Sequence, residues 1–141
     1  MLHSGITTTN GWGAAASDWD NDGDVDLAAT TLFENQRTGE HFLEARVIGD
    51  VVSNRYGVGA TVTLDVAGRK VVRYVSGGSG QGCQDSATLH FGLGTATQVD
   101  SVRVVFIGGG AVSYTGPFDA DQRLWLYESG RVESGWTAPT P

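Results

Sequence analysis

The chain has 141 residues, which is enough for one domain with its own hydrophobic core. Its net charge is −7 at pH 7, and its nine Lys and Arg residues are scattered, whereas a nucleic-acid-binding protein would show a basic stripe. A single cysteine excludes an intrachain disulfide, and no apolar stretch is long enough to cross a membrane. The first residues lack the basic and apolar regions of a signal peptide, so we expect a fragment of a longer protein.

An acidic segment near the amino terminus dominates the net charge. Residues 18–26 read DWDNDGDVD and place five aspartates on alternate positions around one glycine, Gly23. Carboxylates at this spacing repel one another at neutral pH, so a counter-ion is the simplest way to make the loop fold. A hard cation with about six to eight oxygen ligands fits the pattern, which predicts Ca²⁺ ahead of magnesium.

Each aspartate of this loop has an expected role. Asp18, Asp20 and Asp22 would direct their side chains toward the ion, and the intervening glycine would allow the sharp turn. Asp24 would offer its backbone carbonyl while its own carboxylate faces water. Asp26 would complete the coordination shell.

An EF-hand is the main competing interpretation of the acidic segment. That loop needs a bidentate Glu at position 12 and a helix on each side, but position 12 is Ala29. Residues 11–16 are too short and glycine-rich for a stable helix, and residues 27–33 predict a strand. The segment therefore predicts a shorter, nine-residue calcium loop set between strands. A solvated acidic turn without metal is the remaining alternative.

The rest of the chain predicts an all-β fold, an antiparallel β-sandwich of about seven strands with the calcium-loop hairpin at its N-terminal side. Glycine-rich breaks separate short apolar runs, and the run from Ala60 to Val66 alternates cleanly between apolar and polar residues. We expect residues 1–40 to form the calcium-loop unit, residues 41–128 the sandwich and residues 129–141 a flexible tail. The expected strands of the sandwich are 41–48, 60–66, 69–76, 88–92, 99–107, 111–115 and 123–128.

Both zones resemble known modules. The first, from Gly11-Trp12-Gly13 through the aspartate loop to Leu27, resembles one FG-GAP or VCBS repeat. The second resembles the ASPIC/UnbV domain that follows such repeats in cartilage acidic protein-like proteins. Its matching stretches are Ser53-Asn54-Arg55-Tyr56-Gly57-Val58-Gly59-Ala60, Val75-Ser76-Gly77-Gly78-Ser79-Gly80 and Leu89-His90-Phe91-Gly92-Leu93-Gly94.

The resemblance implies a calcium-dependent module at a cell surface or in the extracellular space, associated with adhesion, and it implies no reaction. Its partner would be a protein or glycan ligand at a cell surface or in a matrix. A propeller needs at least about four blades, so one repeat cannot close one. The repeat must then pack on the sandwich or end a longer array.

A few other side chains are candidates for ligand contact. Residues 53–59 predict either a shaped turn or a recognition loop, in which Asn54 and Arg55 contact the ligand with Gln84 nearby in space. Trp12 and Trp19 lie beside or within the calcium loop, where aromatic rings can stack on sugars.

A pairing of Cys83 with His90 is the one candidate for covalent catalysis. It would also need an oxyanion donor and a group that orients the histidine, and the sequence names neither. We therefore expect a structural role for His90, a free thiol at Cys83 and no enzymatic activity. The sequence predicts a calcium-binding adhesion module, with a calcium-dependent carbohydrate-binding module and a structural cap of a larger β-propeller protein as alternatives.

Overall fold

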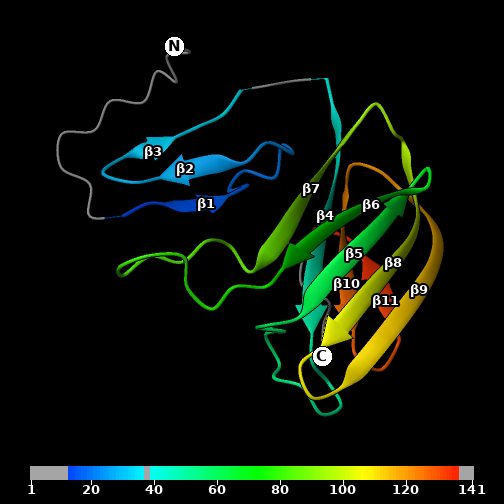
Figure 1. Ribbon diagram of the computed structural model, residues 1–141. Coiled ribbons are helices and arrows are strands. Elements are labelled where there is room, and N and C mark those ends of the chain that lie inside the picture. The colour runs from blue at the N-terminus through cyan, green and yellow to red at the C-terminus, as the bar shows by residue number, and fades with distance from the viewer. Residues whose placement is uncertain (1–12, 37–38, 137–141) are drawn as a thin grey trace.

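The computed structural model describes residues 13–36 and 39–136, and this part of the chain forms eleven strands in three sheets (Figure 1). The described residues contain no helix that could cross a membrane. The strands are β1 (Ala15–Ser17), β2 (Asp26–Ala28), β3 (Leu32–Phe33), β4 (His41–Ile48), β5 (Thr61–Val66), β6 (Arg69–Tyr74), β7 (Thr88–Gly94), β8 (Gln98–Phe106), β9 (Gly110–Asp119), β10 (Gln122–Tyr127) and β11 (Val132–Ser134).

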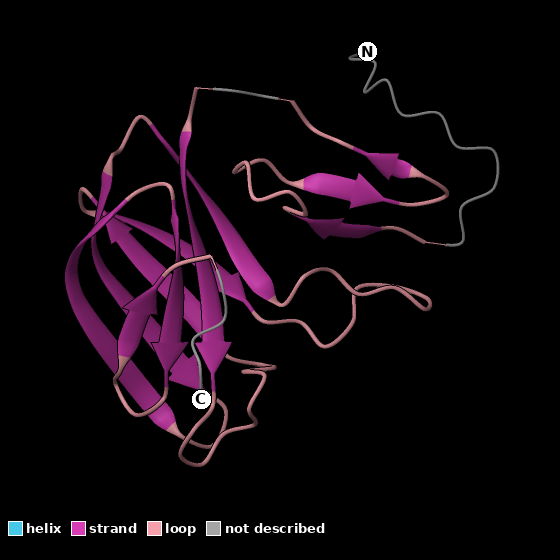
Figure 2. Cartoon of the chain, turned by 180° about the vertical axis from the view of Figure 1, so that it is seen from behind, coloured by secondary structure: helices cyan, strands magenta, loops and turns pink. Residues whose placement is uncertain are grey.

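Two four-stranded sheets form the sandwich, with strand orders β11-β10-β4-β7 and β6-β5-β8-β9 (Figure 2). Alternation along each strand turns every second side chain inward, so apolar residues from both sheets meet in one core. The predicted β-sandwich is thus confirmed. The largest fully buried side chains of this core are Phe91, Leu43, Leu64, Leu124 and Leu126.

The third sheet, in the order β1-β2-β3, lies beside the sandwich rather than within it. The acidic segment connects β1 to β2, as the predicted hairpin requires. The stretch expected as one strand over residues 27–33 is instead split into β2 and β3, because the N–H of Ala29 bonds to the carbonyl of Thr31 and turns the chain back.

The sandwich departs from the sequence prediction at two places around β10. Residues 129–141 were expected to form a flexible tail, but β11 lies in this segment and pairs with β10, with Val132 opposite Leu126. In addition, β10 runs parallel to β4, whereas antiparallel pairing was expected throughout. β11 has only one apolar residue, so alternation gave no signal for it. The parallel pair joins segments far apart in the sequence.

The connection from β4 to β5 is a shaped loop, as one of the two sequence interpretations proposed. The side-chain amide of Asn54 both accepts from the N–H of Val58 and donates to its carbonyl, each at 2.9 Å. Gly57 adopts φ 64°, a conformation that favours glycine. Asn54 therefore acts as a clamp that closes the loop on itself.

Glu128 braces the other half of the same loop. Its Oε2 accepts the N–H groups of Val51, Val52 and Ser53 at 2.9–3.1 Å, and its Oε1 accepts the hydroxyl of Ser53 at 2.9 Å. Burial disfavours the charged carboxylate, but these hydrogen bonds from Ser53, Val52 and Val51 outweigh it and lower the pKa of Glu128 to about 2. The loop is thus held by one charged group at the end of β10.

We expect Glu128→Gln to remove a pH-dependent part of the stability. The pKa of Glu128 falls from 4.5 to about 2 in the folded protein, so its contribution is complete above the higher value and disappears as the pH falls toward the lower one. Thermal melts of the wild type and the variant should differ most at neutral pH and converge toward pH 2. A difference in melting temperature that stays constant over this range would contradict the assignment.

Candidate metal centre and adjoining cavities

The loop between β1 and β2 gathers three carboxylates at one point. One oxygen from each of Asp18, Asp20 and Asp22 lies within 4.8 Å of the others. Ligands on opposite sides of a calcium ion are about 5 Å apart, because each Ca–O bond is about 2.3–2.6 Å long. Three oxygens at this spacing can share one ion, and a set of oxygen donors suits a hard cation. These residues therefore fit the predicted metal.

Backbone amides within the loop fix the positions of these carboxylates. Asp18 is 7% exposed and accepts the N–H groups of Asp22 and Gly23 at 3.2 and 3.0 Å. Asp22 in turn accepts the N–H of Asp24 at 2.9 Å. Gly23 has φ 97°, so the chain reverses at the position where the sequence predicted the sharp turn.

The surroundings of Asp20 disfavour the charged form of its carboxyl group. Desolvation raises the pKa of Asp20, a hydrogen bond from the N–H of Asp22 opposes it, and repulsion from Asp22, Asp26 and Asp18 raises the pKa further. The loop thus disfavours its own negative charge. A bound cation would reverse this effect.

The structure gives the last two aspartates different surroundings from those expected. Asp26 is 3% exposed, and its two oxygens accept the N–H groups of Trp19 at 3.1 Å and Asn35 at 2.8 Å, so it closes the base of the loop. Its role as a metal ligand stays a prediction. Asp24 is half-buried and its Oδ2 is shielded from solvent, whereas the sequence predicted a carboxylate that faces water.

The loop is docked on the sandwich by contacts with Phe42, His90 and Arg123. Gly23 lies so close to the ring of Phe42 on β4 that an added Cβ would be 2.2 Å from a ring carbon. Nε2 of His90 on β7 lies 2.7 Å from the carbonyl oxygen of Gly23, and the imidazole stacks on the same Phe42 ring. Nη2 of Arg123 on β10 donates to Oδ1 of Asn21 at 2.8 Å.

Arg123 and Glu44 are the functional residues that sequence reasoning missed. Glu44 is 2% exposed, and its Oε2 accepts from both Nε and Nη2 of Arg123 at 2.6 Å. Nη1 of Arg123 donates to the carbonyl of Trp136 at 3.2 Å. The available signal was a glutamate inside the apolar strand from His41 to Ile48, because a charged residue in such a strand needs a partner.

Two of the predicted ligand contacts, Trp19 and Gln84, line one cavity of about 470 Å³ at the β1–β2 sheet. Gln84 reaches it because its loop pairs with β1: the N–H of Ser86 donates to the carbonyl of Ala16, and the N–H of Ala16 donates to Asp85. Asn54 and Arg55 lie instead in the β4–β5 connection at the far end of the sandwich (Figure 1). Trp12 lies outside the described residues.

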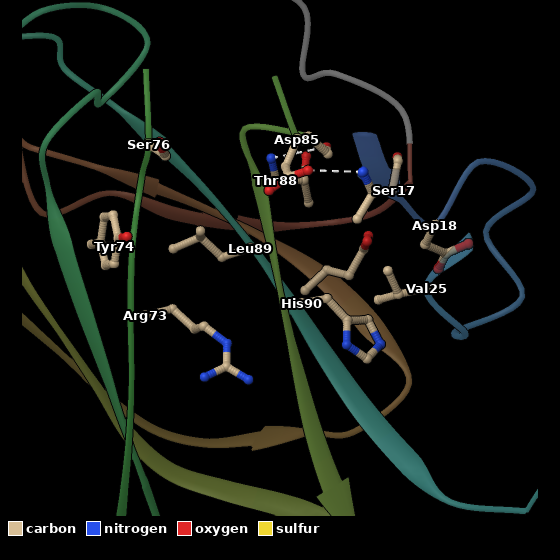
Figure 3. A pocket seen from close by; sticks show the side chains of 13 residues that line it. Ser17, Asp18, Val25, Arg73, Tyr74, Ser76, Asp85, Thr88, Leu89 and His90 are labelled. Carbon is tan, nitrogen blue, oxygen red and sulfur yellow. Dashed lines mark hydrogen bonds between the residues drawn. The ribbon is translucent and has the colours of Figure 1, made fainter. Parts of the chain in front are cut away.

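We call the aspartate-rich loop of residues 18–26 the metal loop. A second cavity, of about 260 Å³, lies between the metal loop and the edge of the sandwich (Figure 3). Asp18, Val25 and His90 lie on one side of it, and Arg73 and Tyr74 of β6 lie on the other. Its lining is more polar than that of the first cavity and includes charges of both signs.

Cys83 and His90 have separate partners in the described part of the chain. Cys83 lies against Gly13, where an added Cβ would be 2.1 Å from its Sγ. His90 is engaged by the metal loop and by Phe42. Among the residues that the structure describes, no hydrogen bond joins the thiol to the imidazole, so no contact supports the pairing of Cys83 with His90.

Residues 50–133 match the protein family described as ASPIC and UnbV, and the chain belongs to this family. Domains of this family are extracellular-type, β-rich modules that often occur with FG-GAP repeats. The match begins after the metal loop and covers β5 to β10 and most of β11. A comparison with curated proteins finds no match.

Gly23→Ala should separate the metal loop from the sandwich. A Cβ at this position collides with Phe42, and φ 97° adds strain of about 1–3 kcal/mol for a residue other than glycine. We expect a lower melting temperature and a changed NMR signal for His90. Gly78→Ala is the matched control, because its added Cβ meets nothing within 4 Å. Equal melting temperatures for the two variants would contradict the docking described above.

Proposed function

We propose that the chain is a non-enzymatic, calcium-binding interaction module of an extracellular or cell-surface protein. The observation that carries the proposal is the convergence of Asp18, Asp20 and Asp22 on one point of a loop that is docked on the sandwich. Membership of the ASPIC and UnbV family supports the extracellular setting. The loop hairpin itself supports the resemblance to a single FG-GAP or VCBS repeat.

Calcium would supply positive charge where the carboxylates of Asp20 and Asp22 are exposed and crowded. The contacts of the loop with the sandwich would then also fix the strands that the loop touches. Asn21 is held by Arg123, and the carbonyl of Gly23 is held by His90, so a fixed loop also fixes β4, β7 and β10 at their contact with it. The proposed role of the ion is therefore structural.

The far end of the sandwich offers a surface for a protein partner. Four apolar side chains of the β4–β5 loop and the β8–β9 turn are more than 60% exposed: Val51, Val52, Tyr56 and Ile107. We call them the apolar tip. Exposed apolar groups held by a rigid backbone are typical of contact sites, and the bonds to Glu128 provide that rigidity. Arg55, an exposed residue of the same β4–β5 loop, adds a positive charge near the tip.

A structural cap at the end of a β-propeller is the second candidate function. It is favoured by one observation: β1, β2 and β3 form a small open sheet beside the sandwich, and β3 pairs with β2 alone among the described strands. An open sheet edge is a site where another strand can add.

We expect calcium to raise the melting temperature of the protein. An ion that binds only the folded state stabilises it by about 2.7 kcal/mol at a concentration of 100 times its Kd. Asp20→Asn and Asp22→Asn should abolish the shift, since each removes a charged ligand while keeping the size of the side chain. The measurement is a thermal melt in chelator, in magnesium and in calcium.

Asp119→Asn is the control for these variants, because this aspartate accepts a hydrogen bond from Gln98 at the end of β9 and takes no part in the loop. It should keep the full calcium shift. An identical melting temperature for the wild type in chelator and in calcium would refute the metal site.

A further inference from the structure

We propose that the cavity between Trp19 and Gln84 binds one ring of a neutral sugar. This inference rests on the proposed function and names its ligand class, since the cavity adjoins the metal loop. Its volume of about 470 Å³ lies within the range of about 300–1,000 Å³ that is typical of small-molecule sites. Sites of that kind combine an apolar wall with a few polar groups that orient the ligand.

The apolar side chains that line the cavity are Trp19, Leu32 and the alanines at 15, 16 and 28. Trp19 is 54% exposed and Leu32 is 46% exposed, although both line a concave site. An indole in this position presents a flat apolar face with one polar N–H at its edge. The C–H face of a sugar ring is complementary to such a surface.

Most of the remaining side chains that line the cavity are polar. Gln84, exposed to solvent, offers an amide that both donates and accepts hydrogen bonds, and the hydroxyls of Ser17 and Ser86 do the same. Sugar hydroxyls need both kinds of partner within one site. The segment that carries Gln84 is fixed, because Ser86 and Asp85 are hydrogen-bonded to Ala16 of β1.

The charges of the cavity argue for a neutral ligand. The ionisable side chains that line it, within the part of the chain that the structure describes, are Asp26 and Asp85, which disfavour an anion such as an acidic sugar. Their charges are engaged by backbone N–H groups of Trp19, Asn35 and Ala16, which weakens the attraction for a cation. Sites for quaternary ammonium groups surround the ligand with an aromatic cage, and among the described residues Trp19 is the one aromatic side chain that lines this cavity.

Trp19 belongs to the metal loop and also lines the cavity. The backbone N–H of Trp19 donates to Asp26, and its neighbour Asp18 belongs to the carboxylate cluster. An ion that fixes this cluster would also fix the backbone that carries the indole. Sugar binding should therefore be stronger in calcium than in chelator.

The test is saturation-transfer NMR followed by titration with the methyl glycosides of galactose, mannose and N-acetylglucosamine, in calcium and in chelator. We expect at least one glycoside to bind. Trp19→Ala should weaken it about tenfold by removing the stacking surface, and Gln84→Ala should weaken it by about two- to tenfold. Tyr74→Ala is the matched control: Tyr74 is an aromatic residue, 69% exposed, that lines only the neighbouring cavity, and its removal should leave the affinity unchanged.

A failure of this inference can be told apart from a failure of the proposed function, because the calcium-dependent melt is measured on the same samples. A calcium shift without binding of any glycoside overturns the sugar site and leaves the metal site standing. Glycoside binding without a calcium shift supports the sugar site and overturns the metal role. Loss of binding in Tyr74→Ala, or binding of choline chloride in place of the glycosides, also overturns the inference.

Discussion

The buried ion pair between Glu44 and Arg123 is the contact on which the arrangement of the other parts depends. Glu44 belongs to β4 and Arg123 to β10, the two central strands of one sheet. Burial raises the pKa of Glu44, and Arg123 opposes this effect with hydrogen bonds and charge. A buried carboxylate without such a partner would be strongly destabilising. The same guanidinium holds Asn21 of the metal loop and the carbonyl of Trp136, so one side chain joins the amino-terminal hairpin, the sheet and the carboxy-terminal segment.

The metal loop is consequently in direct contact with the sandwich. Its contacts with Phe42, His90 and Arg123 all cross the position near residue 40 where the sequence suggested a boundary between units. The family match starts at residue 50, yet Phe42 and Glu44 lie before it. A fragment limited to the matched residues would lack both β4, which lies between β10 and β7, and the partner of Arg123.

The sequence was sufficient to predict features that depend on neighbouring residues. It was insufficient to predict contacts between residues that lie far apart in the chain. Alternation in Val62, Leu64 and Val66 identified a strand with one buried face, and the aspartate spacing identified the loop. Glu128 and Arg123 gave no comparable signal, since the N–H groups that Glu128 accepts lie 75–77 residues away in the sequence and Glu44 lies 79 residues from Arg123. The parallel pairing of β10 with β4 was missed for the same reason, because a strand pattern does not state which strand becomes its neighbour.

Buried carboxylates that accept several backbone N–H groups recur in this protein, and they explain why aspartates at identical spacing have different roles. Asp18, Asp26 and Glu128 each accept at least two such N–H groups and are each less than 10% exposed. Asp20 and Asp22 are exposed and repel their neighbours. Aspartates at a regular spacing therefore fall into two groups. The carboxylates of one group accept backbone N–H groups and shape the loop, and those of the other keep a negative charge that a cation can neutralise. Asp18 belongs to both, because the oxygens that accept amides also lie in the cluster. The loop can consequently fold around its own amides, and the proposed calcium ion would add stability where repulsion remains.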